Sequence, residues 1–131
     1  MDKRSFAYGR LLAAYEKLEE DALVDKQIKQ SEKTEEATRV TNAERFWTAM
    51  IQRPLQTAAL LETRTKYYRN SLGQKNKGRS VFYAKLFTQL YNEIRAYEVD
   101  SMSGKKSANE DFILGYYYQQ QQFYTPKDIE K

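Results

Sequence analysis

Long stretches without a helix-breaking residue are the feature that most constrains the fold of this chain. Its 131 residues include only two prolines and five glycines, so few positions can end a helix or form a tight turn. This spacing is typical of long helices rather than many short strands. The sequence therefore predicts an all-α protein, an antiparallel helical bundle of about four to five helices. We expect a single domain over 1–131, with a short flexible C-terminal tail from about residue 126.

Apolar residues that recur at three- and four-residue steps place the individual helices. In the first helix the apolar stripe comprises Tyr8, Leu11, Leu12, Tyr15, Leu18 and Ala22. Core contacts are also expected from two later groups, Leu55, Ala58, Ala59, Leu61 and Tyr68, and Tyr83, Leu86, Phe87, Leu90, Ile94 and Tyr97. The expected helices cover about 5–30, 44–52, 54–72, 80–100 and 107–123, separated by a polar connector at 30–41, a basic loop at 73–79 and a turn at 101–106.

Helix boundaries follow from caps and breakers. Thr41 with Glu44, and Ser107 with Glu110, have the spacing of capping boxes. Pro54 can only begin a new helix or kink the chain, and Gly73 is a suitable helix end.

Positive charge is concentrated in the middle of the chain. The net charge is +4, and the segment from Arg53 to Arg95 holds nine basic side chains against two acidic ones. A patch of this kind favours a polyanionic partner. The alternative is a solvated basic surface that has no partner.

The densest part of this segment provides candidate phosphate contacts. Lys66 and Arg69 share one helical face, although Arg69 could simply stabilise the helix C-terminus. Phosphates are bound by projecting Lys and Arg side chains without fixed base geometry, and we expect one of Tyr67 and Tyr68 to face the core while the other stacks on unpaired bases. The candidate nucleic-acid-binding residues are Arg64, Lys66, Arg69, Lys75, Lys77 and Arg79, followed by Arg10 and Arg53.

Several kinds of chemistry are excluded or unsupported. The chain has no histidine and no cysteine, which removes catalytic triads, thiol nucleophiles and thiolate metal sites. A phosphate-binding P-loop is rejected because Arg79 stands where that motif requires lysine. We therefore expect no enzymatic activity, no cofactor and no metal. No apolar run approaches the length of a membrane span, and no secretory signal is expected at the N-terminus, so a cytoplasmic protein is expected.

The segment "FILGYYYQQQQFYTPK" at 112–127 is apolar on more than one helical face. Phe112, Gly115, Tyr116, Gln119 and Phe123 share one face, and Gly115 would let another helix approach closely. A helix that is apolar on several sides must be covered on several sides, either by its own bundle or by another polypeptide. The candidate subunit-interface residues are Tyr116, Tyr118, Gln119, Gln120, Gln121 and Gln122.

This segment also resembles a known family. Its Gly-Tyr-Tyr-x-Gln and Phe-x-x-x-Lys patterns are similar to the C-terminal end of the large subunit of the type I-C CRISPR Cascade complex. The stretch "YGRLLAAYEKLEEDAL" at 8–23 is similar to the opening helix of the same region. The two motifs bracket nearly the whole chain.

The resemblance implies a free small subunit of that complex, equivalent to the C-terminal helical domain of the large subunit and made by internal translation. Such subunits are non-catalytic helical bundles that contact Cascade backbone and large subunits, further copies of themselves, the guide RNA and the displaced strand of target DNA. The rival interpretations are a stand-alone nucleic-acid-binding regulator and a purely structural adaptor.

Overall fold

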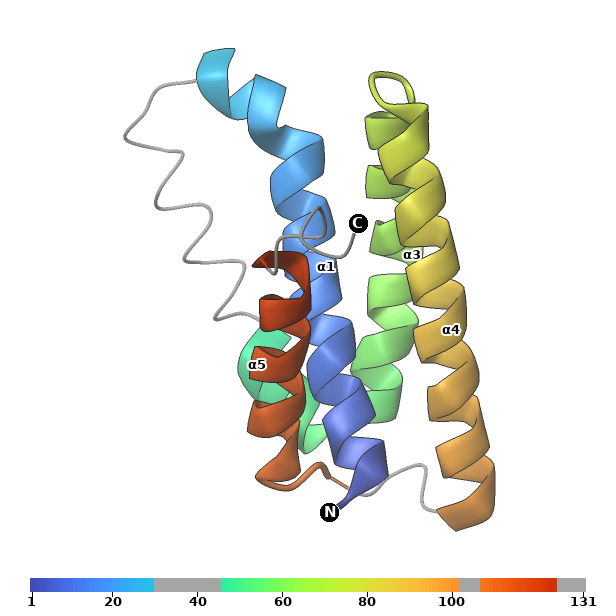
Figure 1. The fold of residues 1–131 in the computed structure, drawn as a ribbon. Helices are drawn as coiled ribbons and strands as arrows, with labels where there is room; N and C mark the ends of the chain where they lie inside the picture. The colour runs from blue at the N-terminus through green and yellow to red at the C-terminus, as the bar shows by residue number, and fades with distance from the viewer. Residues whose placement is uncertain (30–45, 102–106, 125–131) are drawn as a thin grey trace, which may run out of the picture.

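The described residues of this computed structural model are 1–29, 46–101 and 107–124, and no strand occurs among them. The helices are α1 (Lys3–Lys29), α3 (Pro54–Gly73), α4 (Lys77–Ser101) and α5 (Asp111–Tyr124), with a further helical segment at 46–52. Helix α1 packs against the other three, and α3 packs against α4 (Figure 1). The predicted all-α bundle is confirmed. The predicted Thr41–Glu44 cap and the tail lie outside the described residues, and the single domain over the full length stays a prediction.

The helix directions differ from a strictly antiparallel arrangement. Helices α1, α3 and α5 run the same way, and α4 runs against all three (Figure 1). Hydrogen bonds agree: Asp21, late in α1, accepts one from Arg79 at the start of α4, whereas Arg4 donates one to Glu98 near the end of α4. Helices α1 and α3 can share a direction because a long stretch of chain separates them, whereas the short α3–α4 connection requires a reversal.

Two glycines let α1 and α5 pack backbone against backbone. A Cβ atom on Gly9 would lie 2.0 Å from the carbonyl oxygen of Phe112, and one on Gly115 would lie 2.0 Å from that of Phe6. Any larger residue at either position would force the helices apart. The close approach predicted at Gly115 is therefore confirmed, and Gly9 is the partner that the sequence did not reveal.

The first turns of α1 and α5 are joined by a shared set of polar contacts. Asp2 caps α1, since its Oδ1 accepts the backbone N–H of Arg4 at 3.1 Å and its Oδ2 accepts the Ser5 hydroxyl at 2.8 Å. The backbone N–H of Asp2 donates to Asp111 Oδ2, and Ser5 Oγ accepts the N–H of Asn109.

The capping box expected from Ser107 and Glu110 is wrong. Helix α5 begins at Asp111, whose N–H donates to Asn109 Oδ1 at 2.9 Å. Because Ser5 holds the backbone of Asn109, the helix starts later than the spacing of Ser107 and Glu110 indicates.

The connection between α3 and α4 is shorter than the predicted loop at 73–79. Leu72 accepts N–H bonds from both Lys75 and Asn76, which closes the turn after α3. Asn76 then caps α4, since its Oδ1 accepts the N–H of Arg79 at 3.0 Å. Lys77 therefore lies in the first turn of α4 rather than in a loop.

The predicted core is largely confirmed. Every member of the apolar stripe of α1 is buried, and so are Ala58 and Leu61 of α3. Two expected core residues of α3 are exposed instead, Leu55 and Ala59. The buried core residues of α4 include one that the pattern missed, Tyr91, in addition to Tyr83, Phe87, Leu90 and Ile94.

Replacing either crossing glycine should destabilise the fold. We expect Gly9→Ala or Gly115→Ala to lower the free energy of unfolding by roughly 3 kcal/mol or more, because the new methyl group meets backbone atoms that cannot rotate away. Gly78→Ala is the matched control: its Cβ would meet only Asn76 Oδ1, at 3.6 Å, so it should be neutral or slightly stabilising. Chemical denaturation of the three variants checks this, and equal losses at Gly78 and Gly9 would contradict it.

Candidate nucleic-acid interface

The eight cations proposed from the sequence divide into two groups. Three arginines, at positions 10, 64 and 79, form ion pairs with acidic side chains of the bundle. The remaining five lie in α3, at its ends or at the start of α4. They are Arg53, Lys66, Arg69, Lys75 and Lys77.

Arg64 is held inside a cage of aromatic and acidic groups. Its Nε donates to Tyr15 Oη at 2.7 Å, and its Nη2 lies 3.6 Å from Glu19 Oε2. The guanidinium also lies over the rings of Phe46 and Tyr68. Because Glu19 is only 6% exposed, this arginine compensates a buried charge and ties α3 to α1.

Arg79 and Arg10 are also used to hold helices together. Arg79 Nη2 lies 2.6 Å from Asp21 Oδ2, and this hydrogen bond raises the pKa of the Arg79 guanidinium. Arg10 Nε donates to Gln119 Oε1 at 2.9 Å, while its Nη1 lies 3.7 Å from Glu93. Together with Arg64, these side chains are removed from the proposed phosphate-binding set, because their charges are already balanced within the bundle.

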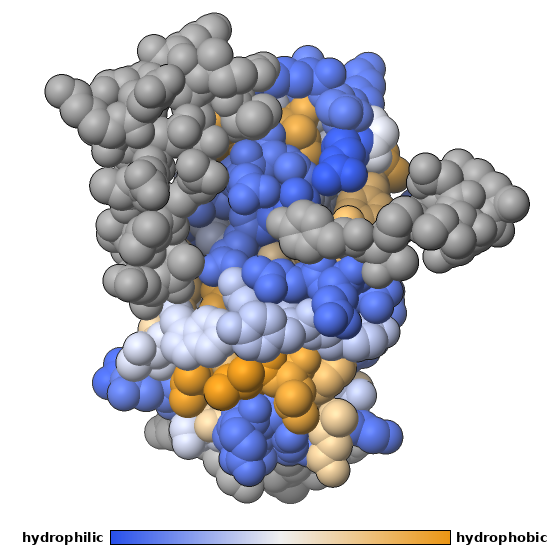
Figure 2. All heavy atoms as spheres, turned by 60° about the vertical axis from the view of Figure 1, so that its left-hand side comes forward, coloured by the Kyte–Doolittle hydropathy of each residue, from blue (hydrophilic) through white to orange (hydrophobic). Residues whose placement is uncertain are grey.

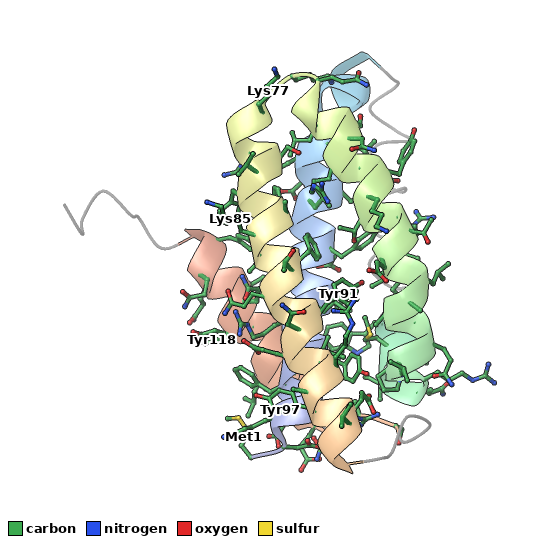
Figure 3. The ribbon with its side chains drawn as sticks, turned by 90° about the vertical axis from the view of Figure 1, so that its right-hand side faces the viewer. Met1, Lys77, Lys85, Tyr91, Tyr97 and Tyr118 are labelled. Atoms are coloured by element: carbon green, nitrogen blue, oxygen red, sulfur yellow. The ribbon has the colours of Figure 1, made fainter. Side chains whose placement is uncertain are left out.

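The other cations lie mainly along the α3–α4 hairpin. Lys66 is exposed and Arg69 is half-buried on α3, and Lys75 and Lys77 are exposed at the tip. Lys77 lies at one end of the molecule and Met1 at the other (Figure 3). Arg53 precedes α3 and so lies at the end opposite the tip (Figure 1). Because this position separates it from the other four cations, Arg53 is also removed from the proposed phosphate-binding set.

Helix pairing adds one cation that was not among the candidates. Arg95 of α4 lies beside Lys66 and Arg69 along the α3–α4 groove. It is 29 residues beyond Lys66 in the sequence, so only the antiparallel packing of the two helices brings them together. Of the neighbouring tyrosines, Tyr67 is 60% exposed and Tyr68 packs against the core, as expected.

The outer face of α5 is apolar and exposed. Ile113, Leu114, Tyr117 and Tyr118 are 42%, 54%, 55% and 44% exposed, and we call them the α5 outer face. Figure 2, turned toward the side that lies left in Figure 1, shows hydrophobic surface on this part of the molecule.

Two of the predicted interface residues lie elsewhere. Tyr116 and Gln119 are 8% and 3% exposed, so they belong to the core of the bundle and offer almost no area to a neighbour. They share the inward face with Phe112 and Gly115, as the helical spacing predicted. Gln121 and Gln122 are exposed and Gln120 is half-buried. The interface candidates chosen from the sequence did not include Ile113, Leu114 and Tyr117. The available signal was that these residues lie off the helical face that carries Gly115 and so point away from the close helix contact.

Neither a metal-binding cluster nor a membrane-spanning helix is found in the part of the chain that the structure describes. No three acidic side chains gather there in a group that could hold a metal ion. None of the described helices combines the length and apolar character that crossing a membrane requires.

The chain was also compared with known protein families. The family described as CRISPR-associated protein (Cas_Csd1) matches residues 1–124. The chain belongs to the Cas_Csd1 family. The match includes both α1 and α5, the helices whose motifs carry the resemblance to a CRISPR complex, and that resemblance is confirmed. No curated protein and no solved structure matches this Cas_Csd1 chain.

Glu16 connects the inward face of α5 to α1 in this Cas_Csd1 chain. The Tyr116 hydroxyl donates to Glu16 Oε1, while Glu16 Oε2 is buried without a hydrogen-bond partner. Burial raises the pKa of the Glu16 carboxyl, and the hydrogen bond from Tyr116 partly opposes this. The folded protein therefore holds a proton on Glu16 up to a higher pH than the unfolded chain does.

The raised pKa of Glu16 predicts how the stability of the fold changes with pH. As pH rises from the ordinary carboxyl pKa through the raised one, the native state binds more protons than the unfolded state, so the Glu16 contribution to stability falls. Glu16→Gln cannot titrate, and its melting temperature relative to the parent should rise between about pH 4 and about pH 7. Tyr116→Phe removes the hydrogen bond that partly opposes the raised pKa of Glu16. The loss of stability with rising pH should therefore be larger in Tyr116→Phe than in the parent. Melting curves of Glu16→Gln and the parent that stay parallel across this range would contradict the prediction.

Proposed function

We propose that this chain is the non-catalytic small subunit of a type I-C CRISPR Cascade surveillance complex in the cytoplasm. The observation that carries the proposal is the match of the Cas_Csd1 family to residues 1–124. The absence of histidine and cysteine from the sequence supports a non-catalytic role. In this proposal the subunit contacts neighbouring proteins and stabilises the opened target DNA through sequence-independent phosphate contacts.

The physical basis for the DNA contact is a nearly balanced equilibrium. In RNA-guided recognition, the guide–target duplex is about as stable as the DNA duplex that it replaces. A protein surface that binds the released strand or the guide–target duplex therefore shifts the equilibrium toward the open form. Lysines at the tip of the α3–α4 hairpin suit this task because an ammonium group contacts phosphate without reading bases.

The protein contacts are assigned to a different helix. The α5 outer face exposes two aliphatic and two tyrosine side chains, and aromatic residues are enriched in protein interfaces. We assign this face to neighbouring Cascade subunits, namely backbone subunits, the large subunit or a further copy of this chain. Helix α5 packs on α1, so occupation of its outer face leaves the α3–α4 hairpin accessible.

Removing two cations from the hairpin tip should weaken binding to single-stranded DNA. We expect the double variant Lys75→Ala, Lys77→Ala to bind on the order of tenfold more weakly at low salt, and the slope of log K against log salt to become shallower by about 1.4. Fluorescence anisotropy at several salt concentrations measures both quantities.

The matched control is the double variant Lys3→Ala, Arg53→Ala, which removes the same charge at the opposite end of the bundle. Both residues are exposed, and this variant should keep the parent slope. Equal effects of the two double variants would indicate a general charge effect instead of a hairpin site.

The same assay separates the rival functions. A stand-alone regulator would bind one duplex sequence with a large preference over random sequence, whereas the proposed subunit should show almost none. A purely structural adaptor would show no salt-dependent binding to nucleic acid at all. That result would remove the DNA contact while leaving the assignment of α5 intact.

A single charge on the α5 outer face should disrupt assembly. Leu114→Glu places a carboxylate where a neighbouring subunit would bury it, at a cost of several kcal/mol. In a reconstituted Cascade complex, we expect this variant to be lost from the assembly during size-exclusion chromatography. Leu60→Glu is the matched control because Leu60 and Leu114 are both 54% exposed. It should stay bound, and retention of both variants would contradict the assignment.

A further inference from the structure

A groove between α3 and α4 has the composition of an anion-binding site. Its cavity has a volume of about 160 Å³, which is room for several water molecules or for one tetrahedral oxyanion. The charged and polar groups that line it come from both helices. The ones that matter here are Thr65, Lys66 and Arg69 of α3, and Thr88, Asn92 and Arg95 of α4.

Two polar atoms along this groove are buried and lack a hydrogen-bond partner. They are Thr65 Oγ1, in a residue that is only 3% exposed, and Arg69 Nε. A threonine inside a helix commonly bonds to the carbonyl four residues earlier, and Thr65 does not do so. Leaving such a group unpaired costs about 1–3 kcal/mol. Thr65 Oγ1 and Arg69 Nε are therefore two donors on one groove that a bound acceptor would satisfy.

The charges of the groove identify the class of ligand. Lys66, Arg69 and Arg95 are opposed by one carboxylate, Glu62, which lies 4.0 Å from Arg95 in an exposed pair. An exposed pair of this kind contributes little energy, so the groove remains positive.

The neutral groups that line the groove also favour an acceptor. Arg95 Nη1 donates to Asn92 Oδ1, which leaves the amide nitrogen of Asn92 as a donor. The Tyr91 hydroxyl is already used on the carbonyl of Ala58. The groove therefore presents mainly hydrogen-bond donors and positive charge, which suit the oxygens of a phosphate.

We propose that this groove binds one phosphodiester group of a nucleic-acid strand. The Thr65 hydroxyl and the Arg69 Nε–H donate to its oxygens, and Lys66 and Arg95 balance its charge. This inference rests on the proposed function and extends it, since it adds a defined site to the general charge of the hairpin tip. Along α3 the groove lies roughly 10–15 Å from the tip lysines, so one strand can contact both.

Direct observation of Arg69 tests the site with a small probe. Dimethyl phosphate, a phosphodiester without bases, is titrated into the full chain while the Nε–H resonances of arginine are followed by NMR. We expect the Arg69 resonance to shift in a saturable way and that of Arg53, at the opposite end, to stay in place. If Arg69 does not shift, or shifts only with inorganic phosphate, the proposal is wrong.

Two substitutions test whether a strand uses the same groups. Thr65→Val keeps the shape but removes the unpaired hydroxyl, so it should reduce affinity for a single-stranded oligonucleotide about tenfold without lowering the melting temperature. Arg69→Met should reduce affinity by a similar factor. Thr63→Val, an exposed position on the same helix, is the control for the first and Arg53→Met for the second. Parent affinity in both groove variants would overturn the proposal.

Failure of this inference can be distinguished from failure of the proposed function. If the tip variant loses oligonucleotide binding while both groove variants keep it, the groove assignment fails and the proposed function stands. If the parent chain does not bind oligonucleotide, the DNA contact of the proposed function and the use of the groove by a strand both fail, even where Arg69 responds to dimethyl phosphate.

Discussion

Contact between the backbones of α1 and α5 at Gly9 and Gly115 determines how the rest of the described bundle is arranged. Because no side chain separates the two helices there, the rotation of α5 about its own axis is fixed. Phe112 and Tyr116 must then face inward, and the residues on the other side must face solvent. The polar contacts that join Asp2 to Asp111 set the same helices in register along their length. Exposure of the α5 outer face is thus a consequence of the crossing rather than of its own sequence.

Arginine and lysine have different roles in this protein. Arg10, Arg64 and Arg79 each contact an acidic side chain and at least one aromatic ring within the bundle. A planar guanidinium with several fixed donors suits such contacts better than an ammonium group does. Lys66 and Lys77, in contrast, remain exposed. The sequence count of positive charge therefore overstates what is available to a polyanion, because part of that charge is paired within the bundle.

The sequence predicted helix positions and the inward residues well, because both depend on local spacing. The apolar stripe of α1 and the inward face of α5 follow directly from a period of 3.6 residues. Properties that depend on which helices meet could not be predicted. Glu19 is buried against Arg64 only because α3 meets α1, and Arg95 joins Lys66 only after α3 and α4 pack together. The start of α5 was misplaced for the same reason, since Ser5 of another helix holds Asn109.

The position of α1 explains how one small bundle could serve two partners at once. Helix α5 packs on α1, which also packs on α3 and α4, and Figure 1 shows α5 on one side of α1 and the hairpin on the other. A protein bound to the α5 outer face would therefore not cover the groove between α3 and α4. The ties that Arg10, Arg64 and Arg79 make to neighbouring helices keep the two surfaces in a fixed relation. A rigid spacing of this kind would let the position of a neighbouring subunit determine where the hairpin meets a strand, without any base-specific contact.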